Sequence, residues 1–466
     1  MQRIFPRWRE LLILLGLAAA VTVPVLISGW MELGRAERAQ ASSDPVGAMQ
    51  HYKNAVRSLP WRSDLWERAG REALAAGQLD DAIHLLERAP RLSADGWLAL
   101  AEANRRMGNI DAAESGYRAA LKQAASAEAY AGIAYVARLH NDPETERAAL
   151  QNSLLLAPGD AASEFRLGLL LVLAEPEQAL AHLQTAAHLD GEYQGVYQTL
   201  SAALRQADLQ PTHSQALLYR GRGLALVGDW ELARRAFEQA VLEDPNLAEG
   251  WAWLGEAKQH LGMDAGSELD RAVSLDGSST VVRGLRGLYW KRQGREREAL
   301  AEYLAAATAE PENPAWAASM GESYARLGDM PSALASFQRA ADLAKRDPVY
   351  WRLLATFCVE YNIQLADVGL PAARKAAQLA PEDPLALDVL GWAQLANGER
   401  DAARQTLLSA LELGPQSASA HLHLALVYLQ DGDRQGAYDH LQRALELDPQ
   451  GSVGSQAASM LKQYFP

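Results

Sequence analysis

Residues 228–262 read GDWELARRAFEQAVLEDPNLAEGWAWLGEAKQHLG, and this stretch decides the fold. In its first half Ala233, Phe237 and Ala240 are four and three residues apart, which places them on one face of a helix. Pro245 follows and stops that helix, because proline lacks the N–H that the next turn would need. The two small alanines let a neighbouring helix approach, and Phe237 fills the space between the two helices.

The second half of the stretch has a different pattern of small and large residues. Trp251 is followed, after two residues, by Leu254 and Gly255, and a glycine at that position permits close packing against another helix. Gly262 then marks a turn before the next apolar stretch. We therefore expect alternating first and second helices, joined by short glycine turns.

The same organisation recurs along most of the chain, with a period near 34 residues. The turn glycines are Gly77, Gly108, Gly228, Gly262, Gly294, Gly328, Gly398 and Gly432. The second-helix pattern of Ala, a large residue, Ala and Pro returns as Ala299, Tyr303, Ala306 and Pro311, as Ala403, Leu407, Ala410 and Pro415, and as Ala437, Leu441, Ala444 and Pro449.

This pattern resembles the tetratricopeptide repeat. The resemblance implies an all-α fold, a right-handed superhelical solenoid of about 11 to 12 helix pairs, here preceded by one transmembrane helix. Some copies depart from the pattern, since the connection 361–371 is longer and the copy around 263–272 is short. We divide the chain into a cytoplasmic N-terminus (1–10), a transmembrane signal-anchor (11–31), a polar linker (32–45), an N-terminal array (46–190) that opens on a lone second helix (46–59), a degenerate half-repeat or bend (191–213), a C-terminal array (214–450) and a capping helix (451–466).

The membrane prediction rests on Leu11–Met31, 21 residues without a charge. Such a helix is long enough to cross a hydrocarbon core of about 30 Å. Arg3, Arg7 and Arg9 precede it, which predicts a single-pass protein of the cytoplasmic membrane with its N-terminus inside and its repeats outside. The alternative is secretion after signal cleavage, for which residues 39–41, Ala-Gln-Ala, would be the cleavage site.

Composition excludes several classes of function. The formal net charge is −14, so the body of the protein has no basic stripe for nucleic acid. The lone cysteine, Cys358, lies among apolar residues and is expected to be inert. His421 and His423 are two apart and point to different faces of a helix, so we predict no metal site. No nucleotide or nucleophile motif is present, so we predict no cofactor and no catalytic residues.

The resemblance also implies a groove, lined by successive first helices, that holds extended peptides or partner helices. The residues expected to turn toward it follow the small packing residue of each first helix: Arg71, Glu102, Arg222, Glu256, Leu288, Glu322 and Trp392. Trp316 and Trp392 fall outside the core register of the other tryptophans and are candidate exposed anchors. The partner-binding prediction is centred on Arg222, Glu256, Trp316, Glu322 and Trp392.

These observations predict a membrane-tethered scaffold that binds other proteins at the cell envelope and is not an enzyme. One alternative is an accessory role in the assembly or export of envelope glycan or exopolysaccharide. Another is an enzyme with an unrecognised site, which would need a cluster of ionisable residues that the sequence does not display.

Overall fold

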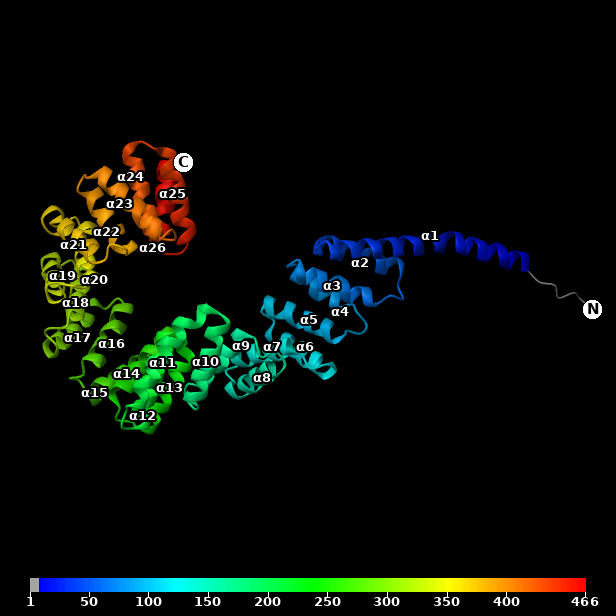
Figure 1. The fold of residues 1–466 in the computed structure, drawn as a ribbon, viewed down its shortest axis with the longest axis horizontal. Coiled ribbons are helices and arrows are strands. Elements are labelled where there is room, and N and C mark those ends of the chain that lie inside the picture. The colour runs from blue at the N-terminus through cyan, green and yellow to red at the C-terminus, as the bar shows by residue number, and fades with distance from the viewer. Residues whose placement is uncertain (1–7) are drawn as a thin grey trace, which may run out of the picture. The chain divides into compact units, whose positions relative to one another are not determined.

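The computed structural model describes the backbone of residues 8–466, and the side chains of residues 15, 17, 20 and 22 onward. Within this range every regular element is a helix, as expected for an all-α chain. The structure divides into two compact units: residues up to Leu209 together with Arg222–Leu232, and Gln210–Gly221 together with Ala233–Pro466. Figure 1 shows the order of the helices along the chain.

In the first unit each helix pair packs on the next. Its helices are α1 (Trp8–Ala41), α2 (Pro45–Ser58), α3 (Asp64–Ala75), α4 (Leu79–Glu87), α5 (Ala94–Met107), α6 (Ile110–Gln123), α7 (Ala127–Leu139), α8 (Pro143–Leu156), α9 (Ala161–Leu171), α10 (Pro176–Leu189), the short η1 (Gly191–Tyr193) and α11 (Gln194–Asp208). The chain then enters α12 (His213–Leu226) and α13 (Trp230–Glu243), where the two units divide.

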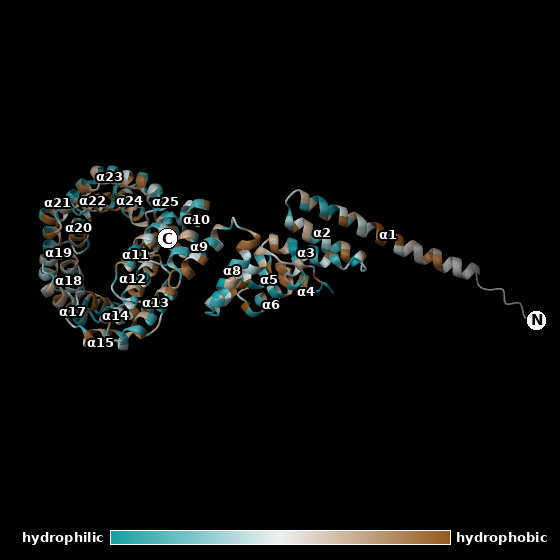
Figure 2. Ribbon diagram, turned by 60° about the horizontal axis from the view of Figure 1, so that its bottom comes forward, coloured by the Kyte–Doolittle hydropathy of each residue, from teal (hydrophilic) through white to brown (hydrophobic). Residues whose placement is uncertain are grey.

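The second unit continues the same succession of pairs, which follow a curved path from α14 to α25 (Figure 2). Its helices are α14 (Ala248–His260), α15 (Gly266–Leu275), α16 (Thr280–Arg292), α17 (Glu296–Ala309), α18 (Pro314–Leu327), α19 (Met330–Leu343), α20 (Pro348–Glu360), η2 (Leu365–Gly369), α21 (Leu370–Leu379), α22 (Pro384–Ala396), α23 (Arg400–Leu413), α24 (Ala418–Asp431), α25 (Arg434–Leu447) and α26 (Ser452–Tyr464). The last of these, α26, packs against α24 and α25.

The repeat pattern has the structural role that the sequence predicts. All eight turn glycines adopt positive φ, between 71° and 86°, a conformation that other residues rarely reach. On α23, Ala403, Leu407 and Ala410 are completely buried, as are the equivalent residues of α25. The prolines of the pattern lie just beyond the last residues of their second helices. The local signals therefore set both the helix ends and the packed face.

The start of the array differs from the prediction. Residues 32–41 are not a polar linker but the last three turns of α1, which pack on α2 through the buried Leu33 and Ala36. The helix expected to stand alone at 46–59 is α2, and α1 is its partner. The prediction was wrong because Arg35, Glu37 and Arg38 lie on the exposed face of a helix whose other face is apolar, while Glu32 pairs with His51 of α2.

The structure finds no helix, within the part of the chain it describes, that is long and apolar enough to span a membrane. The predicted span, 11–31, includes positions whose side chains lie outside that part. Arg3 and Arg7, which carry the predicted orientation, also lie outside the described residues.

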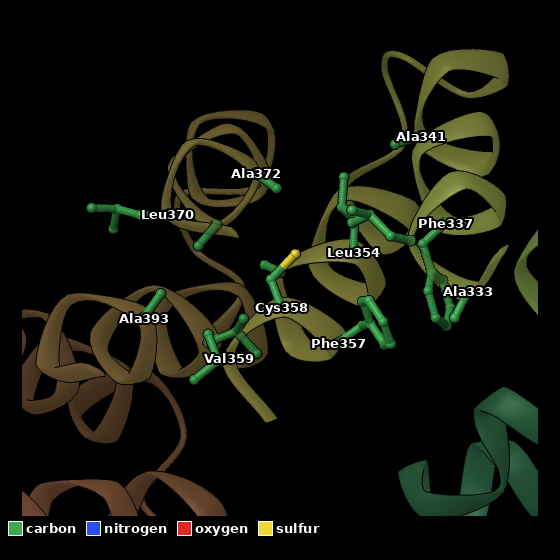
Figure 3. Close-up of a cluster of buried hydrophobic side chains, with 14 of the residues drawn as sticks. Ala333, Phe337, Ala341, Leu354, Phe357, Cys358, Val359, Leu370, Ala372 and Ala393 are labelled. Atoms are coloured by element: carbon green, nitrogen blue, oxygen red, sulfur yellow. The ribbon is translucent and has the colours of Figure 1, made fainter. Parts of the chain in front are cut away.

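The copy with the long connection contains a buried hydrophobic cluster that includes residues of that connection (Figure 3). Cys358 on α20 is fully buried among Leu354, Leu370 and Ala372, and the π-helical turn η2 packs on it. Gly369 lies so close that an added Cβ would be 2.7 Å from the Cβ of Cys358. The extra residues thus form a compact turn that restores the helix pairing.

Candidate functional site

A hollow of about 1130 Å³ opens on the first unit, between the first helices of three successive pairs, α3, α5 and α7. We call it the α3–α5–α7 hollow. Small residues make up much of its wall, which leaves room close to the helix backbones. They are Ala94, Ala99, Ala120, Ala124, Ala125, Ala127, Ala131, Gly132 and Ala157.

Glu102 lies at the centre of the hollow and organises its charges. Arg105 donates two hydrogen bonds to the Glu102 carboxylate, at 2.6 and 2.7 Å, and Arg106 donates a third at 2.7 Å. Burial alone would raise the pKa of Glu102, but the hydrogen bonds from both arginines outweigh it and hold the pKa at about 2. The carboxylate is therefore ionised at neutral pH and keeps two guanidinium groups in place.

Tyr117, from the second helix α6, supplies the fourth hydrogen bond to Glu102, from its hydroxyl at 3.1 Å. Its ring is almost fully buried and lies flat on Gly132 of α7, where any Cβ would collide with the ring. Burial, together with the Glu102 carboxylate, raises the pKa of Tyr117. Gly132 therefore leaves the space in which the Tyr117 ring can lie with its hydroxyl on Glu102.

Two further contacts shape the rim. The half-buried Tyr135 lies under two guanidinium groups, with Arg105 at 5.0 Å and Arg138 at 5.4 Å from its ring centroid. Arg71 on α3 pairs with Asp95 at 3.4 Å, and its side chain remains 50% exposed. The hollow thus combines arginine donors, the carboxylates of Asp95, Glu102 and Glu128, two tyrosine rings and apolar walls, a combination suited to an extended peptide.

The residues predicted to face the groove fall in both units. Arg71 and Glu102 line the α3–α5–α7 hollow, and Arg222 is half-buried on α12. In the second unit Glu256 is buried and accepts two hydrogen bonds of 2.7 Å from Arg292, and Glu322 pairs with Lys291. Leu288 packs into the core formed by α14 to α16.

The two candidate tryptophan anchors are half-buried and have partners. The Trp316 ring lies against Gly284 of the preceding repeat, and its Nε1 donates to Glu310 at 2.9 Å. The Trp392 ring stacks on His423 with 4.6 Å between centroids, while His423 is hydrogen-bonded to Asp388 at 2.7 Å. Both rings thus join successive repeats, and their role in binding a partner stays a prediction.

Sequence reasoning missed Arg105, Arg106 and Tyr135. The spacing of Glu102 to Arg105 and Arg106, three and four residues, is that of ion pairs on one helix and could have indicated the first two. Tyr135 had no such signal, because its position under Arg105 depends on the packing of α5 against α7.

His421 and His423 contact different partners and do not come together at one site. His421 contacts His440, with 2.8 Å between their Nδ1 atoms, while His423 turns to Asp388. Across the residues that the structure describes, no group of three or more His, Cys, Asp or Glu side chains could hold a metal ion.

Residues 286–348 and 389–452 match the family model of the tetratricopeptide repeat. Both segments therefore carry tetratricopeptide repeats. The resemblance found in the sequence is thereby confirmed for these two segments. The repeats in question include α16 to α19 and α22 to α25.

Comparison with known proteins gives similarities of the same kind. Tetratricopeptide repeat protein 37 of Xenopus laevis is 28% identical over 152 residues, which are 32% of this chain but only 10% of that protein. The crystal structure of the APC/C hetero-tetramer Cut9-Hcn1 is similar with a TM-score of 0.41 and 14% identity, over 93% of this chain and 95% of the other. Yeast Tom70 is similar with a TM-score of 0.41 and 15% identity, over the same shares of the two chains.

Proposed function

We propose that this protein is a non-catalytic scaffold that holds an extended segment of a partner protein in the α3–α5–α7 hollow. One observation carries the proposal: three successive first helices, together with residues of α6 and the end of α8, line an open hollow of about 1130 Å³ that holds arginine donors. Repeats of this family generally bind proteins or peptides, so a hollow on their first helices is the expected place for a partner.

The chemistry of the hollow supports a peptide rather than a small molecule. Alanine and glycine walls let a peptide backbone lie close to the helices, while Leu74 and Leu98 offer apolar contacts to its side chains. Arg71 and Arg106 are about half exposed, and their guanidinium groups donate hydrogen bonds well to carbonyl or carboxylate oxygens. Glu102 is already saturated with donors, so it positions Arg105 and Arg106 and does not itself act as an acid or base.

A site-specific crosslink in the native host tests the proposal. A photoreactive residue replaces Leu98 in the hollow, and the matched control replaces Lys122, which is exposed on the second helix α6. A partner captured at Leu98 and absent at Lys122 supports the hollow as the working surface. Equal capture at both positions contradicts it. A photoreactive residue in place of Trp392 tests the predicted site in the second unit in a separate experiment.

The scaffold is further proposed to be tethered to the cytoplasmic membrane through residues 11–31, with the repeats outside. The support is the uncharged sequence of this segment. If the tether is real, the protein stays in the membrane pellet after extraction at high pH, and the mass of the mature chain includes residue 1. Recovery in the soluble fraction with a chain beginning after Ala41 would instead indicate secretion after signal cleavage.

The accessory role in envelope glycan or exopolysaccharide assembly is the alternative within this proposal. The crosslinked partner decides between the two, because a glycosyltransferase or polymerase in the hollow would favour the glycan role.

A further inference from the structure

The described part of α1 leads directly into the first repeat. Trp30, Leu33 and Gly34 have the spacing of the first-helix signature, and Leu33 is buried against α2. Gln40 accepts a hydrogen bond of 2.9 Å from the Tyr52 hydroxyl of α2. The helix is unbroken from Trp8 to Ala41. The apolar part of α1 is therefore joined to the first repeat by continuous helix, without a flexible linker.

The loop between α2 and α3 is fixed to α1 at the end of its apolar part. Gly29 lies so close to this loop that an added Cβ would be 2.7 Å from Cγ of Leu59, which is completely buried. Three residues later the Arg62 guanidinium lies 5.9 Å from the Trp30 ring centroid. Between them Trp61 is left 58% exposed, although nothing in the repeat pattern requires a tryptophan there.

The turn of α1 at residues 22–25, just before the contact with this loop, is exposed on every side, whereas Leu26 is half-buried. Val23, Val25 and Ile27 are 47%, 47% and 55% exposed, and Val25 lies on the side opposite the other two, because residues two apart differ by about 200° on a helix. A protein groove would cover one face of such a helix, whereas a lipid bilayer covers all of it.

We propose that Trp30, Trp61 and Arg62 form an interfacial collar that rests in the headgroup layer of a lipid bilayer and holds the first repeat against it. Tryptophan rings prefer this layer because one edge is apolar and the indole N–H is polar. Arg62 is held by Asp64 through two hydrogen bonds of 2.8 Å, so its part in the collar is to fix the loop against the Trp30 ring. The inference rests on the proposed tether and goes beyond it, since it assigns a lipid-binding role to Trp61, a residue 30 positions after the end of the predicted span.

The test places an environment-sensitive fluorophore on the full chain. W61C is labelled with a nitrobenzoxadiazole dye, and V46C is the control, because Val46 is 49% exposed and lies at the other end of α2. Val46 and Ser58 are 12 positions apart, which corresponds to about 18 Å along the helix. The native Cys358 is fully buried and does not compete for label. The protein is reconstituted into vesicles of phosphatidylcholine and phosphatidylglycerol, with and without a spin-labelled phosphatidylcholine quencher.

If the collar is correct, the emission of the dye at position 61 shifts to the blue when vesicles are present. The spin-labelled lipid then quenches it several-fold more than the dye at position 46. Equal, weak quenching at both positions while the protein floats with the vesicles overturns the collar and leaves the tether standing. Failure of both labelled proteins to float with the vesicles overturns the tether and the collar together.

Discussion

The Arg292 guanidinium donates two hydrogen bonds of 2.7 Å to the Glu256 carboxylate, and the two residues belong to the first helices of successive repeats, α16 and α14. The Glu256 side chain is only 6% exposed, whereas that of Arg292 is 40% exposed. His260 also contacts the carboxylate at 3.1 Å. The pair therefore links two successive repeats, and the buried Glu256 carboxylate relies on Arg292 for its main hydrogen bonds.

Replacing Arg292 should destabilise this junction more than replacing Glu256. R292A leaves a buried carboxylate without its main partner, at a cost of about 2–4 kcal/mol, while E256A leaves an arginine that can reach water. Hydrogen exchange followed by mass spectrometry should show faster exchange in α14 to α16 for R292A than for E256A. R297A on the exposed side of α17 is the control and should leave exchange unchanged. Equal effects of R292A and E256A would contradict the asymmetry.

Gly132 is required by the ring of Tyr117. An added Cβ would come within 2.3 Å of that ring, so G132A must displace the ring and break its hydrogen bond to Glu102. Overpacking of this kind costs about 1–3 kcal/mol. Thermal unfolding should therefore shift downward for G132A. The control is G195A in α11, where no atom lies within 4 Å of the added Cβ. A G132A protein as stable as G195A would show that the ring moves without strain.

The depressed pKa of Glu102 predicts a specific acid response. Its pKa is about 2 in the folded protein, against an ordinary value of 4.5, so its contribution to stability is present above pH 4.5 and is lost as the pH falls toward 2. The full shift would correspond to about 3 kcal/mol, and solvent screening of the partly exposed ion pair reduces this to about 2 kcal/mol. The stability difference between the wild type and E102Q should thus shrink steadily from pH 5 to pH 2. Urea titrations at each pH measure it, and a difference that does not change with pH would refute the assignment.

Cys358 should react only when its repeat opens. Burial raises the pKa of the thiol to about 11, so almost none of it is thiolate at neutral pH, and the side chain has no access to solvent. Ellman's reagent should give no rapid phase with the folded protein and one thiol per chain in guanidinium chloride. The newly accessible W61C is the positive control and should react at once. A fast native phase at Cys358 would mean that α20 and α21 separate readily.

The local features of this fold could be predicted from the sequence. Turn glycines, small packing residues and terminal prolines act within one helix pair, so a period near 34 residues is enough to place helices and their buried faces. The prediction failed at residues 32–41, where a charged outer face hid the signature of Trp30, Leu33 and Gly34. The buried face of residues 32–41 can be recognised only from the structure, in which Leu33 and Ala36 of α1 pack on α2.

What the sequence by itself determined, then, is the identity of the repeats and the helix positions that enter their core, because those depend on residues three, four or 34 apart. The tertiary structure decided which polar groups meet. The tyrosine at 117 reaches Glu102 only because Gly132 on a third helix makes room for its ring, and Arg62 lies over Trp30 only because Leu59 packs on Gly29. These contacts depend on how neighbouring helices are rotated and displaced, and no periodic pattern in a single helix specifies that geometry.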